Sequence, residues 1–297
     1  MELALAVAIE AAIRASTGSR FRISAHQTVS GGSAHQHWSL RGSGAQYFVK
    51  TGPTASHAAF AAEIDGLNAL ASSGVVRTPA VIAAGETPDA AFLILEHLDL
   101  RPMRREDGAR CATALAALHA IQGTQYGWPR DNYIGASPQS NTPHDDWPTF
   151  FAQRRLAPQL AAAARHGHRG ELQTHGARVI EKISAFFLDH RAPPSLLHGD
   201  LWSGNFAVLD SGEPVLFDPA VHYGDREADF AMSELFGGLP ESFYAGYRAA
   251  APLADGYAQR RTLYNFYHVL NHLNLFGPSY WRQAERMARD LSEYLRR

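Results

Sequence analysis

The chain has 297 residues, of which 45% are hydrophobic, 19% charged and 10% aromatic. This composition is typical of a globular protein with one large domain or two lobes, and it excludes a disordered chain, a collagen and a disulfide-rich miniprotein. The formal net charge is -2, so we expect no general attraction to nucleic acid or to an anionic membrane. The single cysteine, Cys111, cannot form a disulfide within the chain and favours a reducing compartment.

The N-terminal residues 1–16 predict an amphipathic surface helix. Glu2 and Glu10 interrupt its apolar run, which distinguishes it from a secretory signal peptide. No other stretch approaches the roughly 20 uncharged apolar residues of a membrane-spanning helix. We therefore expect a soluble and cytoplasmic protein. We also expect a monomer that binds neither nucleic acid nor membrane.

The N-terminal third predicts a small β-rich lobe that carries one inserted helix. In chain order, its predicted elements are the strands 37–41 and 46–50, the helix 57–73, and the strands 79–85 and 90–96. A glycine-rich turn at 42–44 joins the first two strands as a hairpin. Thr54 or Ser56 is positioned to cap the helix, and Gly74 ends it.

Helical periodicity dominates from Leu98 onward. The predicted helices span 107–121, 148–165, 171–190, 226–236, 241–250 and 257–276. A short β region at 196–218 interrupts them, and a long loop rich in Pro, Asn and Asp covers 128–148. The predicted fold class is therefore α+β, with a small antiparallel β-sheet lobe at 1–96 and a larger, mainly helical lobe at 97–297.

The densest cluster of polar residues lies in the short β region. If Ser211 and Gly212 form a two-residue hairpin loop, Asn205 pairs with Asp218 across the two strands. Asp200 lies on the loop that enters the same end of the hairpin. The sequence thus predicts that two carboxylates and an amide lie close together.

Carboxylate and amide oxygens are suitable ligands for Mg²⁺, and a further carboxylate can orient an attacking hydroxyl. Kinase-type phosphoryl transfer uses such parts: a catalytic Asp, and an Asn and a second Asp on the metal. The spacing H-x-D-x-x-x-x-N from His198 to Asn205, followed by Asp218 at a strand end, is specific for this arrangement. The alternative is an Asx-rich turn that only caps a hairpin.

A kinase also needs parts in the small lobe, and the sequence offers each of them. Lys50 ends a predicted strand, and Glu63 lies 13 residues later on the inserted helix, where it can hold the lysine. Gly31 and Gly32 form a turn that could cover phosphates, although such a pair is also common in ordinary hairpins. The segment 93–99 ends the last strand of the lobe and could offer backbone hydrogen bonds to adenine.

At this level of detail the chain resembles the fructosamine kinase (ketosamine 3-kinase) family. That family is a branch of the aminoglycoside phosphotransferase and choline kinase group, with a protein-kinase-like fold. HGDLWSGN at 198–205 and the segment that begins DPAVHYGDRE at 218 carry the resemblance most specifically. Further matching segments are FVK at 48–50, LEHL at 95–98, DNYIG at 131–135, and the stretches 145–160 and 264–277.

The resemblance implies ATP-dependent phosphorylation of the 3-hydroxyl of a ketosamine, a deglycation repair step. The acceptor would be a fructosamine, ribulosamine or erythrulosamine adduct of a small amine or of a glycated protein. By position, the resemblance makes Asp200 the catalytic base and Asn205 and Asp218 the ligands of Mg²⁺. Lys50 with Glu63 would position the phosphates of ATP, and Gly31 and Gly32 would cover them. Adenine would be contacted by Glu96, His97 and Leu98. Residues 1–96 would bind the nucleotide, and residues 97–297 would carry catalysis and the substrate.

One departure from the family pattern affects the phosphate loop. Many relatives read GG-D/C-I-N there, whereas this chain continues from its glycine pair into Ser33, Ala34 and His35. Redox switching through a cysteine in that loop is not expected, because Cys111 lies elsewhere in the chain.

Three further features have two interpretations each. Trp202 lies between the catalytic and metal-binding positions and could line the sugar site or pack in the core. Asp225 could cap the following helix or face the substrate. His268 and His272 have the spacing of zinc ligands on a helix, but without a third ligand a packing role is favoured.

Other functions also fit parts of the pattern. A related small-molecule kinase could act on an aminoglycoside, choline or another sugar. A nucleotide-binding regulator without catalysis is disfavoured, because the five kinase positions are all intact: Lys50, Glu63, Asp200, Asn205 and Asp218. A metallohydrolase is a more distant alternative.

Overall fold

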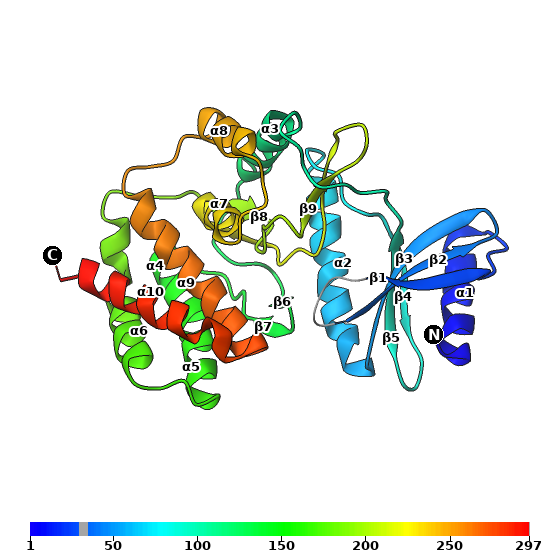
Figure 1. The fold of residues 1–297 in the computed structure, drawn as a ribbon, viewed down its shortest axis with the longest axis horizontal. Helices are drawn as coiled ribbons and strands as arrows, with labels where there is room; N and C mark the ends of the chain where they lie inside the picture. Colours follow the sequence, from blue (N-terminus) through cyan, green and yellow to red (C-terminus); the bar gives the residue numbers. More distant parts are fainter. Residues whose placement is uncertain (30–34, 297) are drawn as a thin grey trace.

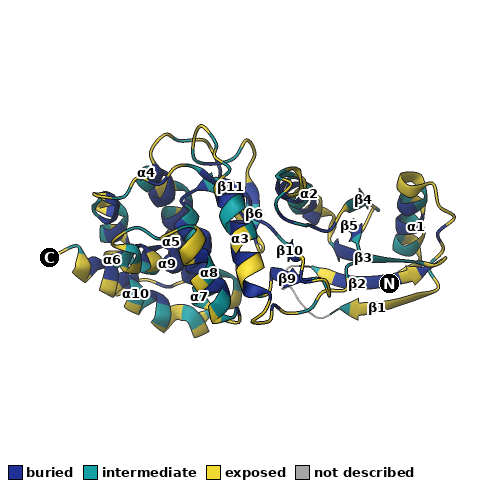
Figure 2. Cartoon of the chain, turned by 90° about the horizontal axis from the view of Figure 1, so that it is seen from above, coloured by how far each residue is buried: buried dark blue, intermediate teal, exposed yellow. Residues whose placement is uncertain are grey.

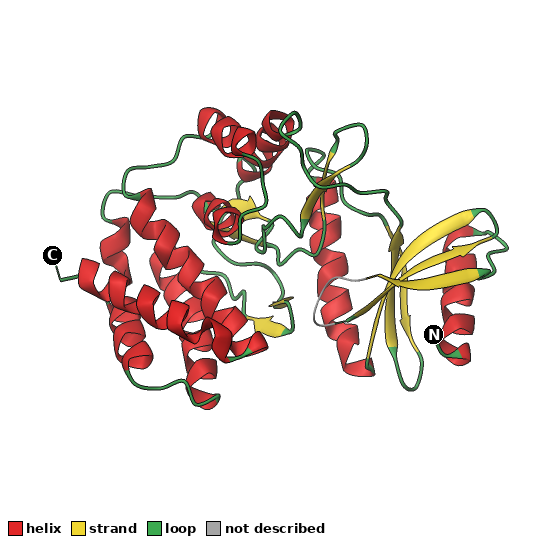
Figure 3. Cartoon of the chain, viewed as in Figure 1, coloured by secondary structure: helices red, strands yellow, loops and turns green. Residues whose placement is uncertain are grey.

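The computed structural model describes residues 1–29 and 35–296. Gly31 and Gly32, the predicted phosphate loop, lie outside the described residues. The chain folds into a part dominated by one β-sheet and a larger helical part, and its two ends lie at opposite ends of the molecule (Figure 1 and Figure 3). Among the described residues, no helix combines the length and apolarity needed to cross a membrane.

The sheet has five antiparallel strands in the order β1-β2-β3-β5-β4. They are β1 (Ala25–Val29), β2 (Gln36–Gly42), β3 (Ala45–Gly52), β4 (Val81–Glu86) and β5 (Ala91–Glu96). The predicted hairpin is confirmed, since β2 and β3 meet at a tight turn where Ser43 and Gly44 both have positive φ. Such a left-handed pair matches the twist of the strands it connects.

Helices α1 (Leu3–Thr17) and α2 (His57–Ser72) cover opposite faces of this sheet. On β5, Phe92 and Ile94 pack in the cluster that contains α1, whereas Leu93 and Leu95 pack against α2. Successive side chains of a strand point to opposite faces, so this strand is buried on both. The small lobe thus has α1, the helix predicted at the N-terminus, on its outer face and the predicted inserted helix on the other. The predicted cap was wrong: the side chain of Ser56 makes no cap hydrogen bond, and a 3₁₀ turn precedes α2 instead.

The larger part is built mainly from helices, whose buried sides face one another (Figure 2). They are α3 (Gly108–His119), α4 (Trp147–Phe151), α5 (Ala157–Arg165), α6 (Glu171–Glu181), α7 (Arg226–Leu235), α8 (Glu241–Ala250), α9 (Tyr257–Phe276) and α10 (Trp281–Tyr294). Helix α10 was not predicted, nor was the short hairpin of β6 (Asn132–Ile134) and β7 (Ser137–Gln139) within the long loop.

Two strand pairs lie in and around the predicted β region, and one of their strands, β11 (His222–Gly224), lies beyond its end at residue 218. The pairs are β8 (Ser195–Leu197) with β11, and β9 (Phe206–Val208) with β10 (Pro214–Leu216). The predicted register was wrong by one residue, because the N–H of Phe217, and not of Asp218, donates to the carbonyl of Asn205 over 3.2 Å. The loop has three residues, closed by a 3.0 Å bond from the Leu209 N–H to the Glu213 carbonyl. Gly212 supplies the positive φ, 76°, that a three-residue hairpin loop requires.

Candidate active site

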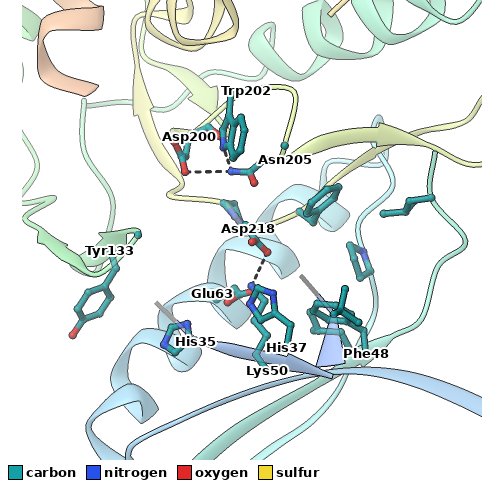
Figure 4. Close-up of a pocket in the computed structure, with 18 of the residues that line it drawn as sticks. His35, His37, Phe48, Lys50, Glu63, Tyr133, Asp200, Trp202, Asn205 and Asp218 are labelled. Atoms are coloured by element: carbon teal, nitrogen blue, oxygen red, sulfur yellow. Dashed lines mark hydrogen bonds and ion pairs between the residues drawn. The ribbon is translucent and has the colours of Figure 1, made fainter. Parts of the chain in front are cut away.

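A cavity of about 790 Å³ lies between the sheet and the helical part. Most residues singled out in the sequence line it: Lys50, Glu63, Glu96, His97, Leu98, Asp200, Trp202, Asn205 and Asp218. Figure 4 shows that the side chains of Lys50, Glu63 and Asp218 converge at its centre, with Asp200 and Asn205 beside them. The structure therefore brings together residues that are up to 168 positions apart in the chain.

Lys50 links the small lobe to the large one. Its Nζ lies 2.6 Å from Glu63 Oε1 on α2 and 2.6 Å from Asp218 Oδ1. The lysine is only 4% exposed. Burial disfavours the charged form of Lys50, but the two carboxylates outweigh burial and raise its pKa. The lysine in turn holds the pKa of Asp218 below its ordinary value. This site therefore keeps a fixed positive charge where phosphate groups could bind.

Asp200 and Asn205 are held together at the other side of the same centre. The Nδ2 group of Asn205 donates to the backbone carbonyl of Asp200 over 2.9 Å and to its Oδ2 over 3.2 Å. Burial, and then the negative charges of Asp218 and Asp229, raise the pKa of Asp200 to about 7. A carboxylate with a raised pKa is a better proton acceptor for a hydroxyl than an ordinary aspartate.

The backbone around Asp200 is fixed by a short turn that requires glycine. Gly199 has a φ of 85°, and a Cβ at this position would lie 2.0 Å from the carbonyl oxygen of Ala220. The ring of His198 accepts from the Asp200 N–H at Nδ1 over 3.2 Å, and its Nε2 donates to the Phe217 carbonyl over 2.9 Å. His198 thereby joins the loop of Asp200 to the strand that leads into Asp218.

Asp229 of α7 anchors this turn from below, and sequence analysis missed it. Its carboxylate accepts from the N–H groups of His198 (2.7 Å) and Gly199 (2.8 Å), and it lies 3.2 Å from His119 Nε2. The only sign of this role in the sequence is that an acidic residue, Asp229, stands next to Phe230 on the buried side of a helix. A single sequence does not reveal which backbone groups such a carboxylate contacts.

We expect Asp229→Asn to lower the free energy of unfolding by about 1–3 kcal/mol and to lower kcat, because an amide cannot accept all three hydrogen bonds. Burial alone raises the pKa of Asp229, but its bonds to His119 and the backbone outweigh it and lower that pKa. The stabilisation is thus complete above about pH 4 and is lost as the pH falls through the lower pKa of the folded state. Urea unfolding at several pH values measures the difference in free energy of unfolding between the wild type and the variant. Asp290→Asn is the control, because Asp290 is exposed. A stability difference that does not shrink at low pH would contradict the assignment.

The end of β5 forms the edge of the cavity that the sequence associated with adenine. The carboxylate of Glu96 accepts hydrogen bonds from the Arg77 guanidinium group (2.6 Å) and from the Ala80 N–H (3.1 Å). By contrast, the backbone groups of His97 and Leu98 make no hydrogen bond to any other described residue. The polar backbone edge of these two residues can therefore serve a planar ligand.

The other wall of the cavity carries the predicted sugar-site residue. Trp202 is 37% exposed and packs edge-on against Phe236, with ring centroids 6.3 Å apart. It therefore lies in the cavity wall and not in the core (Figure 4).

Asp225 lies away from the cavity. It is fully buried, accepts from the N–H of Glu227 at the start of α7 over 2.9 Å, and accepts from the Tyr264 hydroxyl over 2.6 Å. This favours the capping interpretation over a contact with substrate.

The histidine pair on α9 is explained by packing. His268 is buried, and the Nδ1 of His272 donates to the His268 carbonyl over 2.8 Å. No cluster of potential metal ligands within the described part of the chain includes either of them.

A five-stranded antiparallel sheet on a helical part, with a lysine–glutamate pair facing an H-x-D loop, is the architecture of kinase-like phosphotransferases. The structural comparisons show the same fold. An aminoglycoside phosphotransferase superposes with a TM-score of 0.62 at 16% identity, covering 97% of this chain and 98% of the other. A choline kinase from Streptococcus pneumoniae does so with 0.62 at 14%, covering 97% and 99%. At these identities the likeness shows the fold alone.

The chain belongs to the fructosamine kinase family, whose model matches residues 5–294. A curated relative from Synechocystis, named "Probable ketoamine kinase", is 45% identical over 93% of this chain and 92% of its own length. A "putative fructosamine-3-kinase" structure from Thermobifida fusca is 32% identical, with a TM-score of 0.85 over 96% and 98% of the two chains. Another from Haemophilus somnus is 27% identical, with a TM-score of 0.88 over 95% and 96%. These findings confirm the predicted family.

Proposed function

We propose that this protein transfers the γ-phosphoryl group of ATP to the 3-hydroxyl of a ketosamine. The observation that carries the proposal is the convergence of Lys50, Asp200, Asn205 and Asp218 in one cavity of a chain that matches the fructosamine kinase family over nearly its full length. ATP use follows from membership of a kinase family, and the named relatives are ketoamine kinases.

In this proposal residues 1–96 bind the nucleotide, and residues 97–297 carry catalysis and the acceptor. Adenine lies at the boundary of these two parts, against the backbone of His97 and Leu98, whose N–H and C=O groups make no hydrogen bond to another described residue. The phosphates extend along the sheet to Lys50, which Glu63 holds in place. Coverage of the phosphates by Gly31 and Gly32 stays a prediction.

The donor set near Lys50 fits a magnesium ion. Asn205 uses its amide nitrogen for Asp200, and its amide oxygen accepts no hydrogen bond from another described residue. Together with the Asp218 carboxylate it offers the hard oxygen ligands that Mg²⁺ prefers. Bound there with ATP, the ion would neutralise negative charge on the phosphate groups.

The chain's own contribution to the chemical step is positioning and proton transfer. Asp200 accepts the proton of the acceptor hydroxyl, and that oxygen forms a bond to the γ-phosphorus as the bond from phosphorus to the ADP oxygen breaks. ADP and the phosphorylated acceptor are the products. Lys50 supplies positive charge to the phosphates. The turn at Gly199 holds the Asp200 carboxylate in position.

The acceptor wall favours a compact sugar with one amine over a polycationic aminoglycoside. Trp202 and Tyr133 present aromatic surface to the cavity. Three nearby carboxylates of the large lobe do not line the cavity. They bond to the protein instead: Asp131 accepts from the N–H of Asn141, Asp145 accepts from Gln125, and Asp146 caps α4. Two further carboxylates line the cavity, but Asp99 directly follows His97 and Leu98, and the Asp210 carboxylate lies 3.7 Å from Arg101 Nε. The wall around Trp202 and Tyr133 thus offers few free carboxylates for a ligand with many ammonium groups.

A panel of acceptors with ADP release as the readout tests the proposal. We expect turnover with fructosyl-, ribulosyl- or erythrulosyl-lysine, and little with kanamycin or choline. Turnover of kanamycin or choline alone would replace the acceptor assignment with that of a related small-molecule kinase. ATP binding without turnover of any acceptor would support a non-catalytic regulator. Activity on glycated proteins, the monomeric state and the cytoplasmic location stay predictions.

A further inference from the structure

Two histidines of the small sheet line the cavity, and the proposed reaction uses neither. His37 on β2 pairs directly with Lys50 on β3, so the two side chains project from the same face of the sheet. His35 lies just before β2, with its ring centroid 4.6 Å from that of Phe60 on α2. Figure 4 shows both imidazoles on the sheet side of the cavity, near Lys50 and across from Asp200.

The strand register places these histidines relative to the nucleotide. Tyr47 pairs with Glu96 at the adenine edge, and Lys50 pairs with Leu93. These two cross-strand pairs form two rows of the sheet, which lie three residues or roughly 10 Å apart along the strands. His37 shares the row of Lys50, and His35 lies further from the adenine edge. Both therefore lie where the phosphate groups extend, and not where the base binds.

Their charge state suits this position. Burial and the charge of Lys50 lower the pKa of His37, and the same causes lower the pKa of His35 to about 4. Both rings are thus neutral near pH 7 in the protein without nucleotide, and a neutral imidazole still carries one N–H donor. His37 is 9% exposed, and its ring makes no hydrogen bond to another described residue. It can donate to a phosphate oxygen without adding charge repulsion against Lys50.

We propose that His37, with His35 beyond it, forms a polyphosphate contact in the nucleotide site of this chain. The inference rests on the proposed function, since it takes the cavity as the ATP site. His37 contacts the phosphates shared by ADP and ATP, because it lies in the row of Lys50. His35 contacts the terminal phosphate, because it lies further along the same face.

Calorimetric titration with Mg-ATP, Mg-ADP and adenosine tests this assignment. His37→Phe keeps the ring that packs 5.3 Å from Phe48 and removes the N–H donor. We expect it to weaken Mg-ATP and Mg-ADP binding about tenfold or more, since the lost bond is to a charged acceptor. Adenosine binding should stay within about twofold. His37→Gln, which retains a donor, should recover part of the affinity.

His26→Phe is the matched control, because His26 is exposed on β1 of the same sheet and does not line the cavity. Wild-type affinity of His37→Phe for both phosphorylated ligands would overturn the inference while leaving the proposed function intact. Equal weakening of adenosine would also overturn it, since the histidine would then hold the base. Failure of the wild-type protein to bind Mg-ATP would instead overturn the proposed function itself. For His35→Leu we expect weaker Mg-ATP binding and unchanged Mg-ADP binding.

Discussion

Replacement of Asp200 by Asn is expected to lower kcat about 10²–10⁴-fold. In the proposed reaction the Asp200 carboxylate takes the proton of the attacking hydroxyl, and an amide of the same size cannot do so. The bond from Asn205 to the backbone carbonyl at position 200 does not involve the substituted group, so the loop should keep its shape. The dissociation constant of Mg-ATP should therefore change little. Steady-state kinetics with a ketosamine, together with calorimetric titration of Mg-ATP, measure both quantities.

Asp210→Asn provides the control for this experiment. Asp210 also lines the cavity but is 95% exposed at its side chain, and we assign it no part in proton transfer. Its variant should keep the wild-type kcat. Wild-type turnover of Asp200→Asn would show that another group is the base.

Lys50→Arg is expected to lower kcat/KM for ATP about 100-fold, although it conserves the charge. Nζ of Lys50 is buried with one carboxylate on each side, both at 2.6 Å. The wider guanidinium group cannot occupy that space without displacing Glu63 or Asp218, and it delivers its donors in a different geometry. Kinetics with varied ATP concentration measure the effect.

The chain offers an unusually clean control, because Lys182 is its only other lysine and is exposed. Lys182→Arg should have wild-type kinetics. If Lys50→Arg also behaves as the wild type, Lys50 is not the lysine that binds the phosphates.

The parts of the fold that local patterns determine could be predicted from the sequence. The hairpin of β2 and β3 follows from alternation around a glycine turn, and α2 from apolar periodicity ended by Gly74. The spacing from His198 to Asn205 indicated the site, because the residues of one loop stay close in any fold. Glu63 could be paired with Lys50 since both lie in one small lobe.

The remaining features depend on tertiary contacts or on a single backbone angle. The register at Asn205 changes by one residue according to which loop residue takes the left-handed conformation, and Gly212 does so. Asp225 and Asp229 lie on the same short segment, yet Asp225 caps α7 and Asp229 holds the turn at Gly199. Only the packing of α7 beneath the loop distinguishes these roles, and periodicity contains no information on it.

Identification of the reaction product tests the central claim most directly. The purified protein is incubated with ATP, Mg²⁺ and, in separate reactions, fructosyl-, ribulosyl- or erythrulosyl-lysine. The acceptor is then analysed by mass spectrometry and by phosphorus NMR. We predict one added phosphate on the 3-hydroxyl. β-Elimination next to the carbonyl should then release inorganic phosphate, and hydrolysis should free the lysine amine. A phosphate on another hydroxyl, or no phosphorylated adduct with any of the fructosyl, ribulosyl and erythrulosyl acceptors, would contradict the account.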